Sequence, residues 1–162
     1  MNNNIASYKV VPMHSSAVKS VRETMISPFG NLPAWSSVAT GYGPCRSCLR
    51  TFREGEEQRI YITYNPFDGI SDLPLPGPVF IHTEYCKEYA ADGFPLELLD
   101  IPMILEGYGD KSRLVASVAV KTDTLEQQIA DVLSTPGVNF IHVRNREAGC
   151  FIARVEKRAC NT

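Results

Sequence analysis

The sequence predicts an α+β fold, in which a mostly antiparallel sheet of five to seven strands packs against two main helices. A length of 162 residues suits a single domain, spanning residues 1–162, with a sizeable core. Several short runs rich in β-branched and aromatic residues alternate with polar turns, a pattern typical of antiparallel strands. Two further stretches place apolar residues at helical spacing, which predicts the two helices.

The first half of the chain begins with a short strand and a helix. Tyr8 to Val11 is β-prone, and Ser15 or Ser16 then caps a helix whose apolar positions include Val18 and Val21. Residues 32–43 read as irregular and hold Trp35, the chain's only tryptophan. A lone tryptophan in such a segment is most often a plug in the core beneath a loop.

A glycine-rich turn follows and carries a CxxC pair, Cys45 and Cys48. Two thiolates at this spacing can hold one side of a zinc ion or form a redox dithiol. Structural zinc needs two more ligands, and the next candidates, His82 and Cys86, lie far downstream. We therefore expect no cofactor, and we treat zinc on Cys45 and Cys48 as the less favoured alternative to a turn with buried thiols.

The middle of the chain contains two strands on either side of a proline-rich loop. Residues 59–64 form a clear strand, and residues 79–86 begin as another. If the second strand stays extended, Phe80, His82, Glu84 and Cys86 share one face. This alignment places an acid, an imidazole and a thiol in a line, although an ordinary strand end running into solvent is the favoured interpretation.

The second half predicts a short helical turn at residues 93–99, strands at 101–108 and 114–120, and a helix. Asp123 with Glu126, or Thr124 with Gln127, fits a capping box for that helix. Its apolar stripe lies at i, i+4, i+7 and i+8 and consists of Leu125, Ile129, Val132 and Leu133.

The last hairpin, residues 138–155, gathers most of the reactive side chains of this half around the loop 144–149. Both of its strands are apolar on both faces, so we expect it to lie centrally in the sheet. Its register stays open: His142 faces Phe151 if Arg144 pairs with Gly149, and faces Cys150 if the pairing slips by one residue.

Composition narrows the classes of protein that this chain can be. The net charge of −2 argues against a general nucleic-acid coat, which needs a clear basic excess. No apolar run approaches the ~18–20 residues that span a bilayer, and residues 1–7 show no signal peptide. Five cysteines, an odd number, favour reduced thiols. We therefore expect a cytoplasmic protein without nucleic-acid or membrane partners.

Three blocks of the sequence resemble a known family. They are Gly41-Tyr-Gly-Pro-Cys-Arg46 with Gly55 and Glu56, Gly77-Pro-Val-Phe-Ile-His82, and His142-Val-Arg-Asn145 with Gly149-Cys-Phe151 and Arg154-Val155. In this combination the chain is similar to an uncharacterised bacterial family, domain of unknown function 1203, over about residues 41–158. The resemblance implies a small bacterial domain and lends it no activity. In that family Cys45 and Arg46 match the recurring element, and the second cysteine does not recur dependably.

Three functions are compatible with these residues. The first is binding of a small anionic ligand or an acidic peptide, for which the candidates are Cys45, Arg46, His82, His142, Arg144, Asn145 and Cys150. The second is catalysis with Cys150 as nucleophile and His142 as base. The third is a zinc-stabilised scaffold for protein partners. We expect any site to lie where the turn at Cys45 and Arg46 meets the last hairpin.

Overall fold

The strands of the chain divide between two sheets in a computed structural model that describes residues 7–67 and 77–159. The α-helices and strands of these ranges are β1 (Tyr8–Val11), α1 (Ser15–Thr24), β2 (Trp35–Val38), β3 (Gln58–Tyr64), β4 (Gly77–His82), β5 (Met103–Tyr108), β6 (Leu114–Ala119), α2 (Leu125–Ser134), β7 (Phe140–Asn145) and β8 (Phe151–Lys157). The α+β class is confirmed. All strand pairing between these elements is antiparallel, but the strands form sheets of five and three rather than one sheet.

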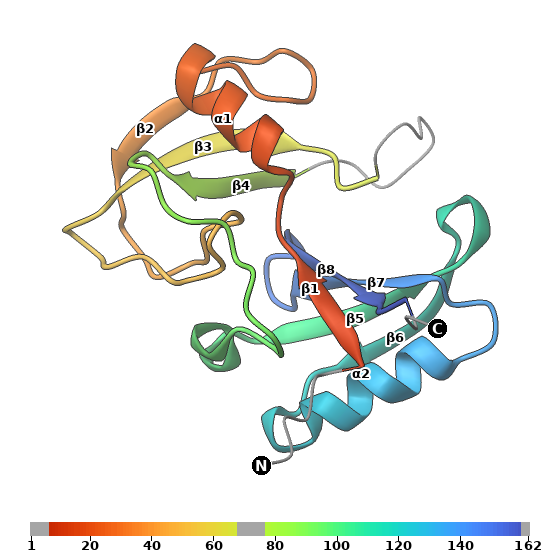
Figure 1. Cartoon of the computed structure of the whole chain (residues 1–162). Helices are drawn as coiled ribbons and strands as arrows, with labels where there is room; N and C mark the ends of the chain where they lie inside the picture. The colour runs from red at the N-terminus through yellow and green to blue at the C-terminus, as the bar shows by residue number, and fades with distance from the viewer. Residues whose placement is uncertain (1–6, 68–76, 160–162) are drawn as a thin grey trace.

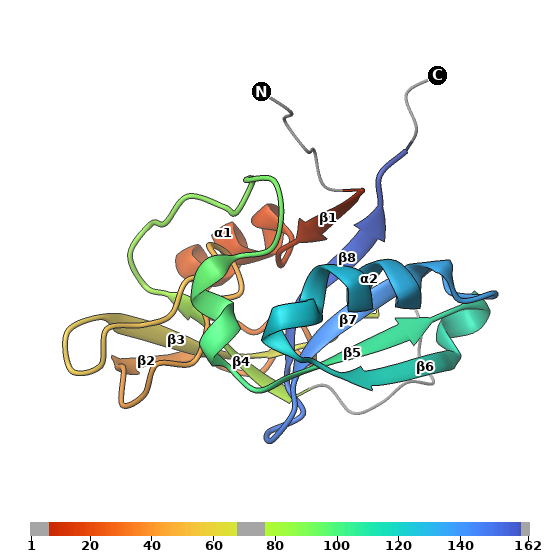
Figure 2. The ribbon, with the colours of Figure 1, turned by 90° about the horizontal axis from the view of Figure 1, so that it is seen from below.

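The larger sheet has the strand order β1-β8-β7-β5-β6, and α2 packs across one of its faces (Figures 1 and 2). The last hairpin, β7 and β8, lies in the middle of this sheet, as its doubly apolar pattern predicts. A β-bulge between Val143 and Arg144 shifts the register, so that His142 faces Arg154 and Arg144 faces Phe151. Neither register considered from the sequence is therefore the one that forms.

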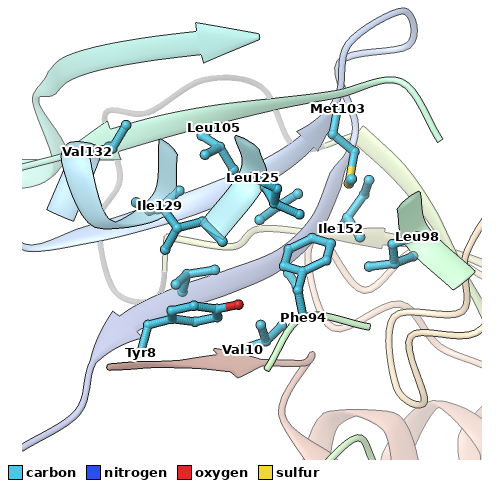
Figure 3. Close-up of a cluster of buried hydrophobic side chains, with 14 of the residues drawn as sticks. Tyr8, Val10, Phe94, Leu98, Met103, Leu105, Leu125, Ile129, Val132 and Ile152 are labelled. Carbon is cyan, nitrogen blue, oxygen red and sulfur yellow. The ribbon is translucent and has the colours of Figure 1, made fainter. Parts of the chain in front are cut away.

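The core of the larger sheet lies beneath α2. Leu125, Ile129, Val132 and Leu133 are all buried, which confirms the predicted stripe. Figure 3 shows Leu125, Ile129 and Val132 of the helix against Leu105 and Met103 from β5, with Tyr8 of β1 on the opposite side of the cluster. The predicted capping box does not form, because a 3₁₀ turn at Thr122–Thr124 precedes the helix and Thr124 donates its hydroxyl to the carbonyl of Lys121.

The smaller sheet has the order β2-β3-β4 and packs one face against α1 (Figure 1). Alternate residues of β3 and β4 point into this second core, where they meet Val18 and Val21 of the helix. His14, rather than Ser15 or Ser16, caps α1, because its ring nitrogen accepts from the backbone N–H of Ser16. Among the described residues, no helix is long and apolar enough to cross a bilayer.

Residues 32–43 contain a strand that the sequence does not predict. Residues 35–38 form the edge strand β2, paired with β3, instead of irregular chain. The expectation that Trp35 plugs the core is wrong, since the side chain is 59% exposed and stacks on Tyr61 with ring centroids 5.2 Å apart. A four-residue strand flanked by glycine and proline carries too little periodicity to be recognised locally.

Arg46 joins the two sheets. Its backbone N–H donates to the carbonyl of Phe80 in β4, and its side-chain Nε donates to the carbonyl of Phe151 in β8 at 2.6 Å. The guanidinium is 1% exposed and also donates to the carbonyl of Pro44 and the sulfur of Cys150. The turn at Cys45 and Arg46 therefore does meet the last hairpin, at the seam between the sheets.

We expect Ile129→Ala to lower the free energy of unfolding by ~2–5 kcal/mol, because it removes a fully buried side chain from beneath α2. Urea denaturation followed by circular dichroism measures the change. Leu114→Ala, at a side chain that is 50% exposed, is the matched control and should change the midpoint little. If Ile129→Ala unfolds at the same urea midpoint as the wild-type protein, the burial of α2 against this core is contradicted.

Candidate metal centre

Four potential metal ligands from separate parts of the chain meet in the core of the smaller sheet. They are Cys45, Cys48, His82 and Cys86, and their ligand atoms all lie within 4.8 Å of one another. All four residues are buried, with exposed fractions of 0%, 5%, 5% and 9% in that order. Thiols and imidazoles are the ligands that zinc prefers, so the chemistry of the group points to a metal.

Local structure explains how each ligand reaches the cluster. Cys45 follows Pro44 and pairs as a parallel bridge with Phe80, which fixes its thiol beside β4. The chain then turns back, with the N–H of Leu49 donating to the Cys45 carbonyl, and this turn brings Cys48 alongside. Leu49 has a positive φ of 57°, a conformation uncommon for a residue other than glycine.

The other two ligands come from the end of β4 and the bend after it. Antiparallel pairing with Arg59 sets the position of His82, the last residue of the strand. The chain bends directly after His82, so Cys86 does not continue along the face of an extended strand. It lies instead with its sulfur 3.9 Å from that of Cys45.

The distances fit a single tetrahedral ion. Zinc–sulfur bonds of about 2.3 Å and zinc–nitrogen bonds of about 2.0–2.1 Å imply sulfur–sulfur edges of about 3.8 Å and sulfur–nitrogen edges of about 3.5 Å. Two distances in the cluster are close to these values. The sulfurs of Cys45 and Cys86 are 3.9 Å apart, and the Cys48 sulfur lies 3.4 Å from Nδ1 of His82. Both distances are close to edges of such a tetrahedron, and all four ligand atoms lie within 4.8 Å of one another.

Neighbouring groups support each ligand. The backbone N–H of His82 donates to the sulfur of Cys45, and the guanidinium of Arg22 donates to the sulfur of Cys86, both at 3.3 Å. The Glu57 carboxylate lies 3.4 Å from Nε2 of His82, the ring nitrogen that does not face the thiols. A carboxylate in this position orients a metal-binding histidine and fixes its tautomer.

Without a metal the cluster shares its protons unevenly. Burial raises the pKa of the Cys45 thiol, whereas hydrogen bonds from Cys45 and Cys48 lower the pKa of Cys86. Burial lowers the pKa of His82, but the nearby Cys48 and Cys86 sulfurs outweigh it and raise the pKa to about 10. The pocket therefore favours negative charge on sulfur together with a cation beside it.

The expectation of an incomplete ligand set is wrong, because His82 and Cys86 complete the group begun by Cys45 and Cys48. The sequence contained the signal in the spacing C-x₂-C followed by H-x₃-C. The two halves of this pattern are far apart in the chain, with Cys48 and His82 separated by 34 residues. Pairing of β3 with β4 brings the two parts of the pattern together in space, and no short stretch of the sequence predicts that pairing.

His142 lies in a different environment from the one its candidate role as a base requires. Its ring is fully buried among four aromatic rings, with centroids 4.7 Å from Phe67, 5.2 Å from Tyr108, 5.1 Å from Phe140 and 5.0 Å from Phe151. Among the described residues, neither ring nitrogen has a hydrogen-bond partner, so none links it to Cys150. Burial, reinforced by Arg144 and Arg154, lowers the pKa of His142 to about 3.

The remaining hairpin candidates have partners within the protein. Arg144 forms an ion pair with Glu106 at 3.0 Å and donates to the carbonyl of Gly149. The side-chain oxygen of Asn145 accepts from two backbone N–H groups of the hairpin loop. A cavity of about 600 Å³ opens beside Arg144 and Asn145 and is also lined by Glu106. The Glu106 carboxylate offsets the positive charge of Arg144, which would otherwise attract an anionic ligand.

The structure thus defines an α+β protein of two antiparallel sheets with a closed cluster of three cysteines and one histidine. The family model described as protein of unknown function (DUF1203) matches residues 42–157, and the chain belongs to this family. The match includes all four residues of the cluster. No curated protein and no solved structure matches the chain.

We expect the pH dependence of stability to report on His142. The unfolded histidine gains its proton near its ordinary pKa of 6.5, whereas the folded one resists protonation until about pH 3. The free energy of unfolding should therefore fall as the pH drops through this window, by about 2–3 kcal/mol between pH 7 and pH 4.5 from this residue. The variant His142→Phe should lose that part of the pH dependence in urea titrations, and equal slopes for both proteins would contradict the assignment.

Proposed function

We propose that this chain binds one zinc ion through Cys45, Cys48, His82 and Cys86, and that the ion has a structural role. The observation that carries the proposal is the convergence of four buried ligand atoms within 4.8 Å of one another, with two of their separations close to the edges of a zinc tetrahedron. Among the three functions compatible with the sequence, this observation favours the zinc-stabilised scaffold.

The ligand type and number support zinc in a structural role. Soft thiolate ligands select zinc, copper(I) or iron–sulfur clusters over magnesium and calcium, and a tetrahedral set with one imidazole suits a single zinc ion. Catalytic zinc sites keep one position open for water, whereas structural sites are closed by four protein ligands. Here four protein ligands are available and all are buried, which supports a closed site.

The charges around the cluster suit a bound dication. Three thiolates and a neutral imidazole around a dication carry a net charge of −1. The Arg22 guanidinium on Cys86 and the Arg50 guanidinium beside Cys48 would offset this charge, and the Cys48 sulfur raises the pKa of Arg50. Nδ1 of His82 faces the thiols and Nε2 faces Glu57, so the histidine has both the metal-side and the carboxylate-side contact of a zinc ligand.

Zinc would connect segments that have little regular structure of their own. The turn at residues 44–51 and the chain at residues 83–95 contain no helix and no named strand. Binding free energies of structural zinc reach about 10–16 kcal/mol in small domains, and they add to the free energy of folding. The proposed role of the ion is therefore to fix these two segments against the end of β4.

We expect the purified protein to carry one zinc per chain by elemental analysis. Cys48→Ser should lose the metal and lower the melting temperature, because serine replaces a thiolate ligand. Cys150→Ser is the matched control: this cysteine is free and lies outside the cluster, so zinc content should stay at one. Cobalt(II) substitution offers a second readout, since thiolate coordination gives a characteristic absorption that Cys48→Ser should weaken and Cys150→Ser should keep.

Two outcomes would overturn this proposal. One is a well-folded protein that contains no metal after purification and shows no rise in melting temperature on adding zinc. The other is zinc that remains at one per chain in Cys48→Ser and is lost in Cys150→Ser, which would move the metal to the hairpin.

A second expectation concerns the Glu57 carboxylate, which lies beside Nε2 of His82. Removing its charge with Glu57→Gln should weaken zinc binding by about 10–100-fold, the usual effect of losing such a partner. Competition with a chromophoric chelator measures the affinity. Glu54→Gln changes an exposed glutamate of the same loop and should leave the affinity unchanged. Equal affinities for both variants would show that Glu57 does not orient the ligand.

A further inference from the structure

The chain exposes an uncharged, apolar segment beside the smaller sheet. No Asp, Glu, Lys or Arg occurs between Ile26 and Cys45, although such residues make up 21% of the sequence. The exposed large apolar side chains of the described residues concentrate here, with six of ten in residues 26–42: Ile26, Phe29, Leu32, Trp35, Val38 and Tyr42. Exposed apolar surface of this kind is typical of a protein–protein interface.

The strand β2 lies at the centre of this segment and forms one edge of its sheet. Only β3 pairs with it in the sheets that the structure describes, so its other side presents backbone groups without a strand partner (Figure 1). Trp35 is 59% exposed and Val38 is 40% exposed. An open, uncharged edge strand is a template for pairing with another strand, which proteins usually prevent with charged residues.

The other edges of the two described sheets carry such protection. Lys9 lies within β1. The edge strand β6 has Arg113 at one end and Lys121 at the other, so self-pairing centred on Ser117 would set these like charges opposite each other. The outer side of β4 is occupied by the bridge between Phe80 and Cys45. Among the edges of these two sheets, β2 is therefore the exposed one whose flanking residues also carry no charge.

We infer that β2 pairs antiparallel with β2 of a second copy of this chain, joining the two three-stranded sheets into one six-stranded sheet. An isologous pair of antiparallel strands needs a two-fold axis that is perpendicular to the sheet and runs between the strands, so that one residue of each strand faces its own copy across that axis. Ser36 and Ser37, at the centre of β2, are small and uncharged and suit this position. Because the whole segment lacks charge, a second copy meets no like-charge repulsion in any register.

This interface is separate from the zinc proposal. The variants that test it lie outside the four ligands, and the readouts below measure mass and tryptophan environment rather than metal content.

Sedimentation velocity across a concentration series tests the assembly with the full chain. The wild-type protein should reach the mass of two chains. Val38→Lys places a charge on the edge of β2 and should shift the equilibrium at least tenfold toward the monomer, with zinc content and circular dichroism unchanged. Val115→Lys makes the same change at a similarly exposed valine of edge strand β6 and should leave the dimer intact.

Trp35 supplies an independent readout, because it is the chain's only tryptophan and lies on the proposed interface. Dilution through the dissociation range should shift its emission to longer wavelength in the wild-type protein, and Val38→Lys should show the longer wavelength at every concentration. A wild-type protein that stays monomeric throughout overturns the inference. So does a dimer that survives Val38→Lys, or one that Val115→Lys breaks instead.

Discussion

Four buried groups that can bind a metal, Cys45, Cys48, His82 and Cys86, set the arrangement of the smaller half of this protein. Polar side chains inside a core are costly unless each has a partner. Here the partners are one another, and the Arg22 and Glu57 side chains complete the set from outside. The irregular segments on both sides of β4 converge at this point.

The cluster is also connected to the larger sheet through the residue next to its first ligand. Arg46 leaves the same turn as Cys45 and donates to the carbonyl of Phe151 and the sulfur of Cys150 in the last hairpin. A buried guanidinium needs each of its N–H groups satisfied, so the turn and the hairpin must keep one relative position. Ordering the turn by a metal would therefore also order the seam between the two sheets.

The hairpin residues that look chemically capable in sequence make most of their contacts with other groups of the larger sheet. His142 is an uncharged ring among aromatic rings, and Asn145 closes the loop by accepting from backbone N–H groups. Arg144 forms an ion pair with Glu106 of the neighbouring strand β5. Side-chain type alone could not distinguish these structural uses from binding or catalysis, because the distinction depends on which groups lie opposite each residue.

The sequence by itself determined the α+β class, the helix α2 with its buried stripe, and the central place of the last hairpin. These features follow from local periodicity, which a short window contains in full. Only the tertiary structure decided the division into two sheets, the bulged register at Val143 and Arg144, and the meeting of Cys48 with His82. Each depends on which strands pair across long stretches of chain, and the free energy of that pairing comes from packing that no single segment carries.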